Sequence, residues 1–121
     1  MARSLIAVRP ISPDERAVLE RAVRVAAVDG ADIPALDQLE RLQVVGKCEC
    51  GCATVQFRYP RSGQIPGIVA DAMGETPTGE RVDILVFASE GHFTELEIVG
   101  YSDFPASLPV ASTIRGYAVA P

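Results

Sequence analysis

The chain has 121 residues, of which 48% are hydrophobic and 22% are charged, and it carries a formal net charge of −5. These values predict one globular domain over residues 1–121 and argue against disorder, and the acidic balance argues against nucleic acid as a partner, because phosphate contacts need a basic face. The apolar run before Arg9 is too short for a signal sequence or a membrane span, so we expect a cytoplasmic protein that binds no membrane.

The first predicted element is an amphipathic helix that begins after Ser12. Ser12 and Glu15 form the pattern of a capping box, and the following apolar residues recur every three or four positions until Gly30 ends the pattern. A second, shorter helix is predicted over residues 33–42, where leucines recur at every third position. Two N-terminal helices are therefore expected.

From residue 44 to residue 59 the pattern changes to the alternation of a long strand. Cys48, Cys50 and Cys52 share one side of that strand, whereas the apolar residues after them have the opposite parity. A regular strand cannot bury both sets on one face, so we expect a bulge near Gly51. In this interpretation Cys48 and Cys50 face the core, and Cys52 lies at the irregularity.

Three further strands follow, over residues 67–74, 81–89 and 93–101, and tight turns connect them. The expected fold is α+β, with two N-terminal helices packed on one face of an antiparallel sheet of about four strands in a meander. Residues 102–121 form an extended C-terminal tail that the sequence does not place. Its apolar residues should hold it against the domain: Phe104, Leu108, Ile114 and Tyr117.

The order of "RPISPDERAVLERAV", "LDQLERLQVV", a strand with a glycine kink and "DILVFASEGHFTELEIVGYSDFP" resembles small uncharacterised bacterial domains. Such domains are recorded as of unknown function, and some are suspected to be immunity proteins beside bacterial toxins. The resemblance implies a non-catalytic protein-interaction module and assigns no catalytic residue. Many of these domains have a glycine-rich polar stretch where this chain has Cys48 to Cys52, so the thiols fall outside the resemblance.

The three cysteines allow three interpretations. Cys48, Cys50 and Cys52 could bind zinc with His92 as the fourth ligand, although alternate residues of a strand diverge unless a bulge turns them together. Cys50 and Cys52 could instead form a redox-active disulfide, with Lys47 favouring the thiolate. Ordinary packing of small apolar side chains against the helices is the preferred interpretation, so no cofactor is expected, with zinc as the alternative.

The acidic residues Glu95 and Glu97 share one face of the last strand, with Asp71, Asp83 and Glu90 expected on neighbouring strands and turns. They could be a catalytic carboxylate pair, but alternation alone predicts a solvated polar face. We see no signature of a catalytic triad, a phosphate loop or a dinucleotide site. The sequence therefore predicts an interaction module whose Glu95 and Glu97 meet a basic protein surface, and a zinc or thiol-redox protein as the alternative.

Overall fold

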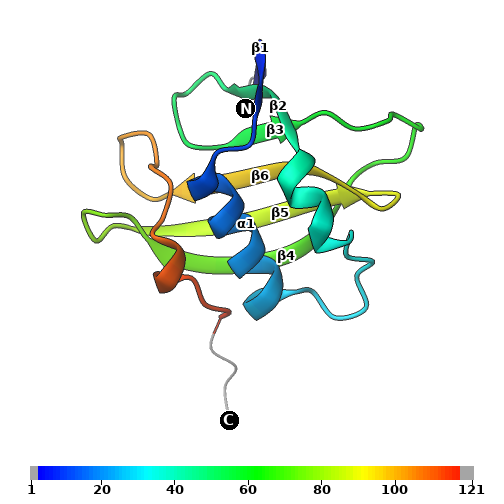
Figure 1. The fold of residues 1–121 in the computed structure, drawn as a ribbon. Helices are drawn as coiled ribbons and strands as arrows, with labels where there is room; N and C mark the ends of the chain where they lie inside the picture. The colour runs from blue at the N-terminus through cyan, green and yellow to red at the C-terminus, as the bar shows by residue number, and fades with distance from the viewer. Residues whose placement is uncertain (1–2, 118–121) are drawn as a thin grey trace.

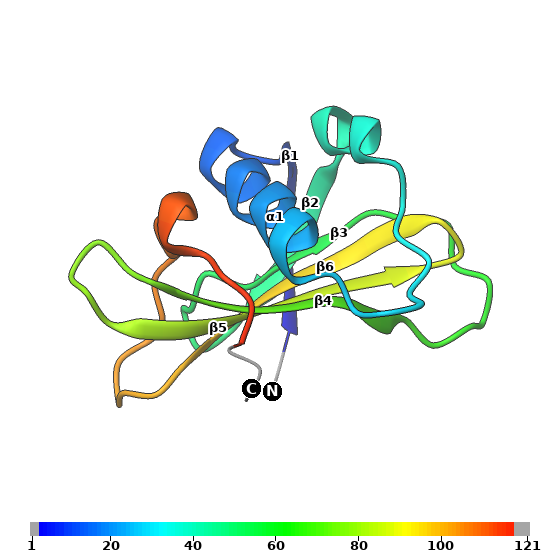
Figure 2. The same ribbon diagram turned by 90° about the horizontal axis from the view of Figure 1, so that it is seen from below.

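A six-stranded antiparallel sheet forms the centre of the molecule, with the strands in the order β1–β2–β3–β6–β5–β4 (Figure 1). The computed structural model describes residues 3–117. The strands are β1 (Arg3–Pro10), β2 (Gln43–Cys48), β3 (Val55–Phe57), β4 (Gly67–Glu75), β5 (Arg81–Ser89) and β6 (His92–Gly100). One α-helix, α1 (Pro13–Ala26), and two 3-10 helices, η1 (Leu36–Arg41) and η2 (Ala111–Thr113), lie on one side of the sheet (Figure 2).

The hydrophobic core lies between α1 and the sheet face that it covers. On this face every second residue of the strands is buried, as in β5, where Val82, Ile84 and Val86 are fully buried and the residues between them are half-buried. The aromatic side chains of Phe57 and Phe93 fill the same core. None of the helices described over residues 3–117 is both long enough and apolar enough to cross a membrane.

The expected sheet of about four strands is wrong, because two strands were missed. Residues 3–10 form β1, which pairs with β2 through a register shift between Leu5 and Arg9. The predicted long strand over residues 44–59 is two antiparallel strands, β2 and β3, joined by a loop that carries the cysteines. The chain reverses where the sequence predicted a bulge. The alternation before the cysteine loop belongs to β2 and the alternation after it belongs to β3, so the two sets of residues need not share one parity.

The expectation of two N-terminal α-helices is also wrong. Residues 36–41 form the 3-10 helix η1, with Leu39 buried. Three residues complete one turn of a 3-10 helix, and this is the spacing of Leu36, Leu39 and Leu42 in the sequence. The three-residue leucine repeat is therefore the signature of a 3-10 turn on the core rather than of an α-helix.

The structure confirms α1 and its capping box. The Ser12 hydroxyl accepts a hydrogen bond from the Glu15 amide at 3.1 Å, and the Glu15 carboxylate accepts one from the Ser12 amide at 2.9 Å. The helix ends at Ala26, before Gly30, because the next residues turn to pair with β4: the Val28 amide donates to the Val69 carbonyl at 2.9 Å.

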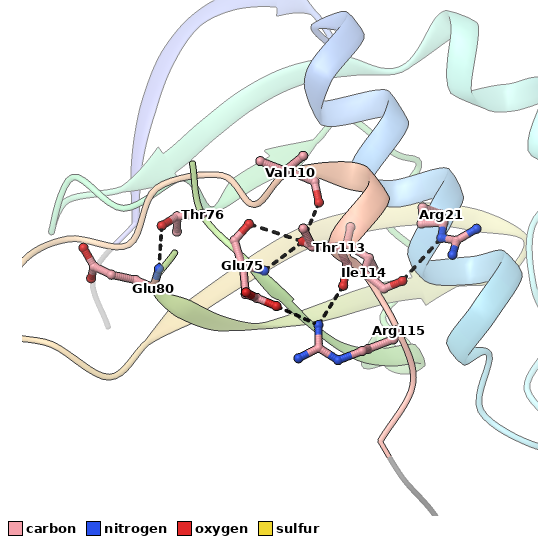
Figure 3. Close-up of polar contacts among 8 residues, drawn as sticks. All are labelled: Arg21, Glu75, Thr76, Glu80, Val110, Thr113, Ile114 and Arg115. Atoms are coloured by element: carbon pink, nitrogen blue, oxygen red, sulfur yellow. Dashed lines mark hydrogen bonds and ion pairs between the residues drawn. The ribbon is translucent and has the colours of Figure 1, made fainter. Parts of the chain in front are cut away.

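The C-terminal segment lies along the outer edge of β4 (Figure 3). The Thr113 hydroxyl accepts from the Glu75 amide at 2.9 Å, and the backbones of Met73 and Arg115 exchange two hydrogen bonds of 2.9 Å. Ile114 is buried against the core, whereas Phe104 and Tyr117, which the sequence expected to hold the tail, are 80% and 41% exposed. The tail is thus placed as far as residue 117, and residues 118–121 lie outside the described residues.

Candidate thiol site

The loop between β2 and β3 begins with a tight turn that carries the first two cysteines. The Gly51 amide donates to the Cys48 carbonyl at 3.2 Å, which closes a four-residue β-turn with Cys50 in its third position. Gly51 adopts a φ of +89°, a conformation that a side chain would disfavour. This turn makes Cys50 project from the sheet end while Cys48 remains in β2.

The three sulfurs converge, and all lie within 4.8 Å of one another. Cys48 is buried and Cys50 is exposed, yet the Cys48 thiol donates a hydrogen bond to the Cys50 sulfur over a distance of 2.9 Å. The Cys52 amide also donates to the Cys50 sulfur, at 3.4 Å. The exposed sulfur therefore receives two hydrogen bonds, of the kind that stabilise a thiolate.

The pKa values of the two contacting thiols are shifted in opposite directions. The hydrogen bond from Cys48, followed by the bond from the Cys52 amide, lowers the pKa of Cys50 below the usual cysteine value. Burial, followed by the hydrogen bond to Cys50, raises the pKa of Cys48 to about 11. Of the two thiols, Cys50 therefore forms the thiolate more readily, and Cys48 retains its proton more strongly.

Cys52 is anchored to the rest of the sheet instead of being free to react. It is buried, and its thiol donates to the Thr54 hydroxyl at 3.3 Å. The Thr54 hydroxyl in turn accepts from the Ile98 amide of β6 at 2.9 Å. This chain of contacts holds the loop against β6 and fixes the direction of the Cys52 amide.

Two details differ from the sequence prediction for these residues. Cys50, which parity assigned to the core, is exposed, because the strand ends before it. The sulfurs in closest contact are those of Cys48 and Cys50, whereas the sequence suggested a pair of Cys50 and Cys52 with help from Lys47. The hydrogen bonds that lower the pKa of Cys50 come from the neighbouring cysteines, and Lys47 is not among their donors.

The residues present do not form a closed zinc site. His92, the expected fourth ligand, begins β6 and pairs with Ser89, at the opposite end of β6 from the Ile98 that holds the cysteine loop. Within residues 3–117 the candidate ligands that gather here are the three cysteines alone, whereas a structural zinc site takes four protein ligands.

Glu95 and Glu97 lie on the face of the sheet opposite α1, but they are not an open acidic patch. Glu95 forms an ion pair with Arg3 at 2.6 Å, and its side chain is 17% exposed. Burial, and then the neighbouring Glu95, raise the pKa of Glu97 above its usual value. Asp83, on the next strand, is held by hydrogen bonds from Tyr101 and Arg81.

Sequence reasoning missed the segment that supports the thiol loop from the other side. The Ala53 amide donates to the Ala106 carbonyl at 2.9 Å, and Pro105 lies 3.7 Å from the point where a side chain on Gly51 would begin. No local pattern signals this contact, because it joins segments more than 50 residues apart.

Comparison of the chain with protein-family profiles, with curated proteins and with solved structures found no match. The site must therefore be interpreted from its own chemistry.

Proposed function

We propose that this protein is a thiol–disulfide redox protein in which Cys50 attacks the substrate disulfide and Cys48 resolves the intermediate. The observation that carries the proposal is the 2.9 Å contact between an exposed and a buried sulfur within one turn. A disulfide has a sulfur–sulfur length of about 2.05 Å, so the two sulfurs need to approach by only about 1 Å to form the bond. The opposite acidities of the two thiols support the same assignment of roles.

The reaction proceeds in two exchanges. The Cys50 thiolate attacks one sulfur of the substrate disulfide, forms a mixed disulfide and expels the other substrate sulfur as a thiolate. Cys48 then gives its proton to that leaving thiolate and attacks the Cys50 sulfur, which expels the second substrate sulfur as a thiolate that takes a proton from water. The protein ends with a Cys48–Cys50 disulfide and has passed two electrons and the Cys48 proton to the substrate, and water supplies the second proton. A thiol reductant returns it to the starting state by the reverse exchange.

This function places the protein in a reducing compartment, in keeping with a cytoplasmic location, because the reduced form must be regenerated. The Arg3–Glu95 ion pair favours the redox function over an interaction module that binds a basic partner through Glu95 and Glu97. Glu95 already has a cationic partner within the chain.

The first test uses reduced protein and hydroxyethyl disulfide, a small neutral substrate. Mass spectrometry should find a Cys48–Cys50 disulfide in the product, whereas Cys48→Ser should accumulate a mixed disulfide on Cys50 and Cys50→Ser should not react. Cys52→Ala is the matched control and should still form the Cys48–Cys50 bond. Equal trapping of substrate on Cys52 in the unsubstituted protein would contradict the assigned roles.

The second test measures the pKa of Cys50 from the pH dependence of its alkylation. We expect half-maximal reactivity below the value of about 8.5 that an exposed cysteine normally shows. Cys48→Ala should raise this pKa, because the hydrogen bond from Cys48 is the largest cause of its lowering. An unchanged pKa in Cys48→Ala would show that the contact between the sulfurs does not activate Cys50.

Elemental analysis separates this proposal from a metal protein. A redox dithiol should be purified with less than about a tenth of an equivalent of zinc, since structural zinc sites bind tightly and retain their ion. One equivalent of zinc per chain, lost in Cys52→Ala, would overturn the proposal in favour of a three-thiolate site.

A further inference from the structure

A groove opens directly beside the exposed Cys50. It has a volume of about 280 Å³ and runs between the cysteine loop, the end of β6 at residues 98–100 and the segment of residues 102–106. Cys50 forms part of its wall, and Phe104 forms another part. A molecule held in this groove would therefore be in contact with Cys50.

The groove has a stable frame and an exposed aromatic residue. The backbone bond between Ala53 and Ala106 ties the cysteine loop to the opposite wall. Phe104 is 80% exposed although its amide is held by the Ser102 hydroxyl at 3.3 Å. A large apolar side chain held at a groove beside a nucleophile has surface to bury against a ligand.

The size and the charge of the groove restrict the substrate. Small-molecule sites usually enclose roughly 300 Å³ or more, so this groove suits a single side chain rather than a whole tripeptide such as glutathione. Asp103 is the charged residue among those that line it. Its carboxylate opposes the carboxylates of glutathione and favours a cation.

We infer that the substrate of Cys50 is a polypeptide disulfide whose cysteine is preceded or followed by one apolar and one basic residue. The apolar side chain enters the groove against Phe104, and the basic side chain lies near Asp103. This inference rests on the proposed redox function and assigns its substrate class.

The test compares three short disulfide-linked peptide dimers that contain Leu-Cys-Arg, Ala-Cys-Arg or Leu-Cys-Glu, together with glutathione disulfide and hydroxyethyl disulfide. Reduced protein is the reductant under anaerobic conditions, and each rate is divided by the rate of dithiothreitol on the same substrate to remove intrinsic reactivity. The Leu-Cys-Arg peptide should react about tenfold faster than the Leu-Cys-Glu peptide, with Ala-Cys-Arg between them.

Phe104→Ala should reduce the advantage of the Leu-Cys-Arg peptide over the Ala-Cys-Arg peptide, because the apolar side chain loses its contact in the groove. Ile65→Ala is the matched control, because Ile65 is 92% exposed in a different loop, and it should change no rate. Equal normalised rates on all peptides, or a fastest rate on glutathione disulfide, would overturn the substrate assignment alone. Failure to reduce hydroxyethyl disulfide as well would overturn the redox function itself.

Discussion

Two cysteines that differ by two positions have opposite environments because one turn separates them. Cys48 is the last residue of β2 and is covered, whereas Cys50 occupies the third position of the turn and meets solvent. Their sulfurs nevertheless touch, so the buried thiol acts as a hydrogen-bond donor to the exposed one. In the redox reaction that we propose, this asymmetry assigns the attacking role to Cys50 and the resolving role to Cys48.

Glu90 is the one described non-glycine residue with a positive φ, at +48°. With Gly91 it forms the two-residue connection between β5 and β6, in which both residues have φ above zero, as in a type I′ turn. Glu90→Asn should stabilise the protein by about 1 kcal/mol, because asparagine adopts this conformation at lower cost.

Urea unfolding measures this change, and Glu90→Gln is the control because it removes the same charge without improving the turn. If Glu90→Asn and Glu90→Gln are equally stable, the turn conformation is not the source of the effect.

At the scale of elements, the start of α1 is held by more than its cap. Glu15 receives hydrogen bonds from both terminal nitrogens of Arg9, each at 2.8 Å, as well as from the Ser12 amide. Burial raises the pKa of Glu15, but the bonds from Arg9 and Ser12 outweigh it and lower the net value. The carboxylate therefore links the end of β1 to the beginning of the helix.

Glu15→Gln should lower the free energy of unfolding at neutral pH by about 1–2 kcal/mol. Because the folded pKa of Glu15 is lowered, its contribution is fully present above the unfolded pKa of about 4.3 and is lost as the pH falls through the folded pKa. The difference between the two proteins should therefore shrink in acid.

Denaturant unfolding at a series of pH values tests this prediction. Glu20→Gln is the control on the same helix, since Glu20 has a more exposed ion pair with Arg24 and should contribute less than about 0.5 kcal/mol. A difference for Glu15→Gln that grows toward low pH would contradict the assignment.

Elements with a strong local pattern were predictable from the sequence, and elements defined by distant partners were not. The capping residues of α1 and the alternation of Leu96 and Ile98 in β6 belong to the elements themselves. β1 forms only because it pairs with β2, after α1 and η1 have intervened, so no local signal marks it. For the candidate site, the sequence identified the cysteines, but which sulfur is exposed depends on where β2 ends.

At the scale of the whole molecule, both ends of the described chain contribute to the sheet. β1 forms one edge, and the C-terminal segment covers the other edge along β4, together with residues 27 and 28. The covered edge cannot accept a further strand, which protects it from association. The same C-terminal segment continues from the loop that lines the groove beside Cys50, so its docking also positions that loop.

Ile114→Ala should destabilise the protein by about 2–4 kcal/mol, because the side chain is 1% exposed and its loss leaves a cavity between α1 and β4. Val110→Ala, in which a 39% exposed side chain of the same segment is shortened, should cost less than about 1 kcal/mol. Thermal unfolding gives both values. Hydrogen exchange of the Met73 amide, which bonds to Arg115, should accelerate in Ile114→Ala and remain slow in Val110→Ala.

The contact between Cys48 and Cys50 is local, and this has a consequence for the timing of oxidation. Two thiols two positions apart are never distant in the unfolded chain, so they can meet on the growing chain before β6 has been synthesised. Cys52 differs, because its anchor runs through Thr54 to Ile98 and exists only after the sheet has formed. A nascent chain therefore presents Cys52 as openly as the other two cysteines, and completion of the sheet withdraws Cys52 from exchange.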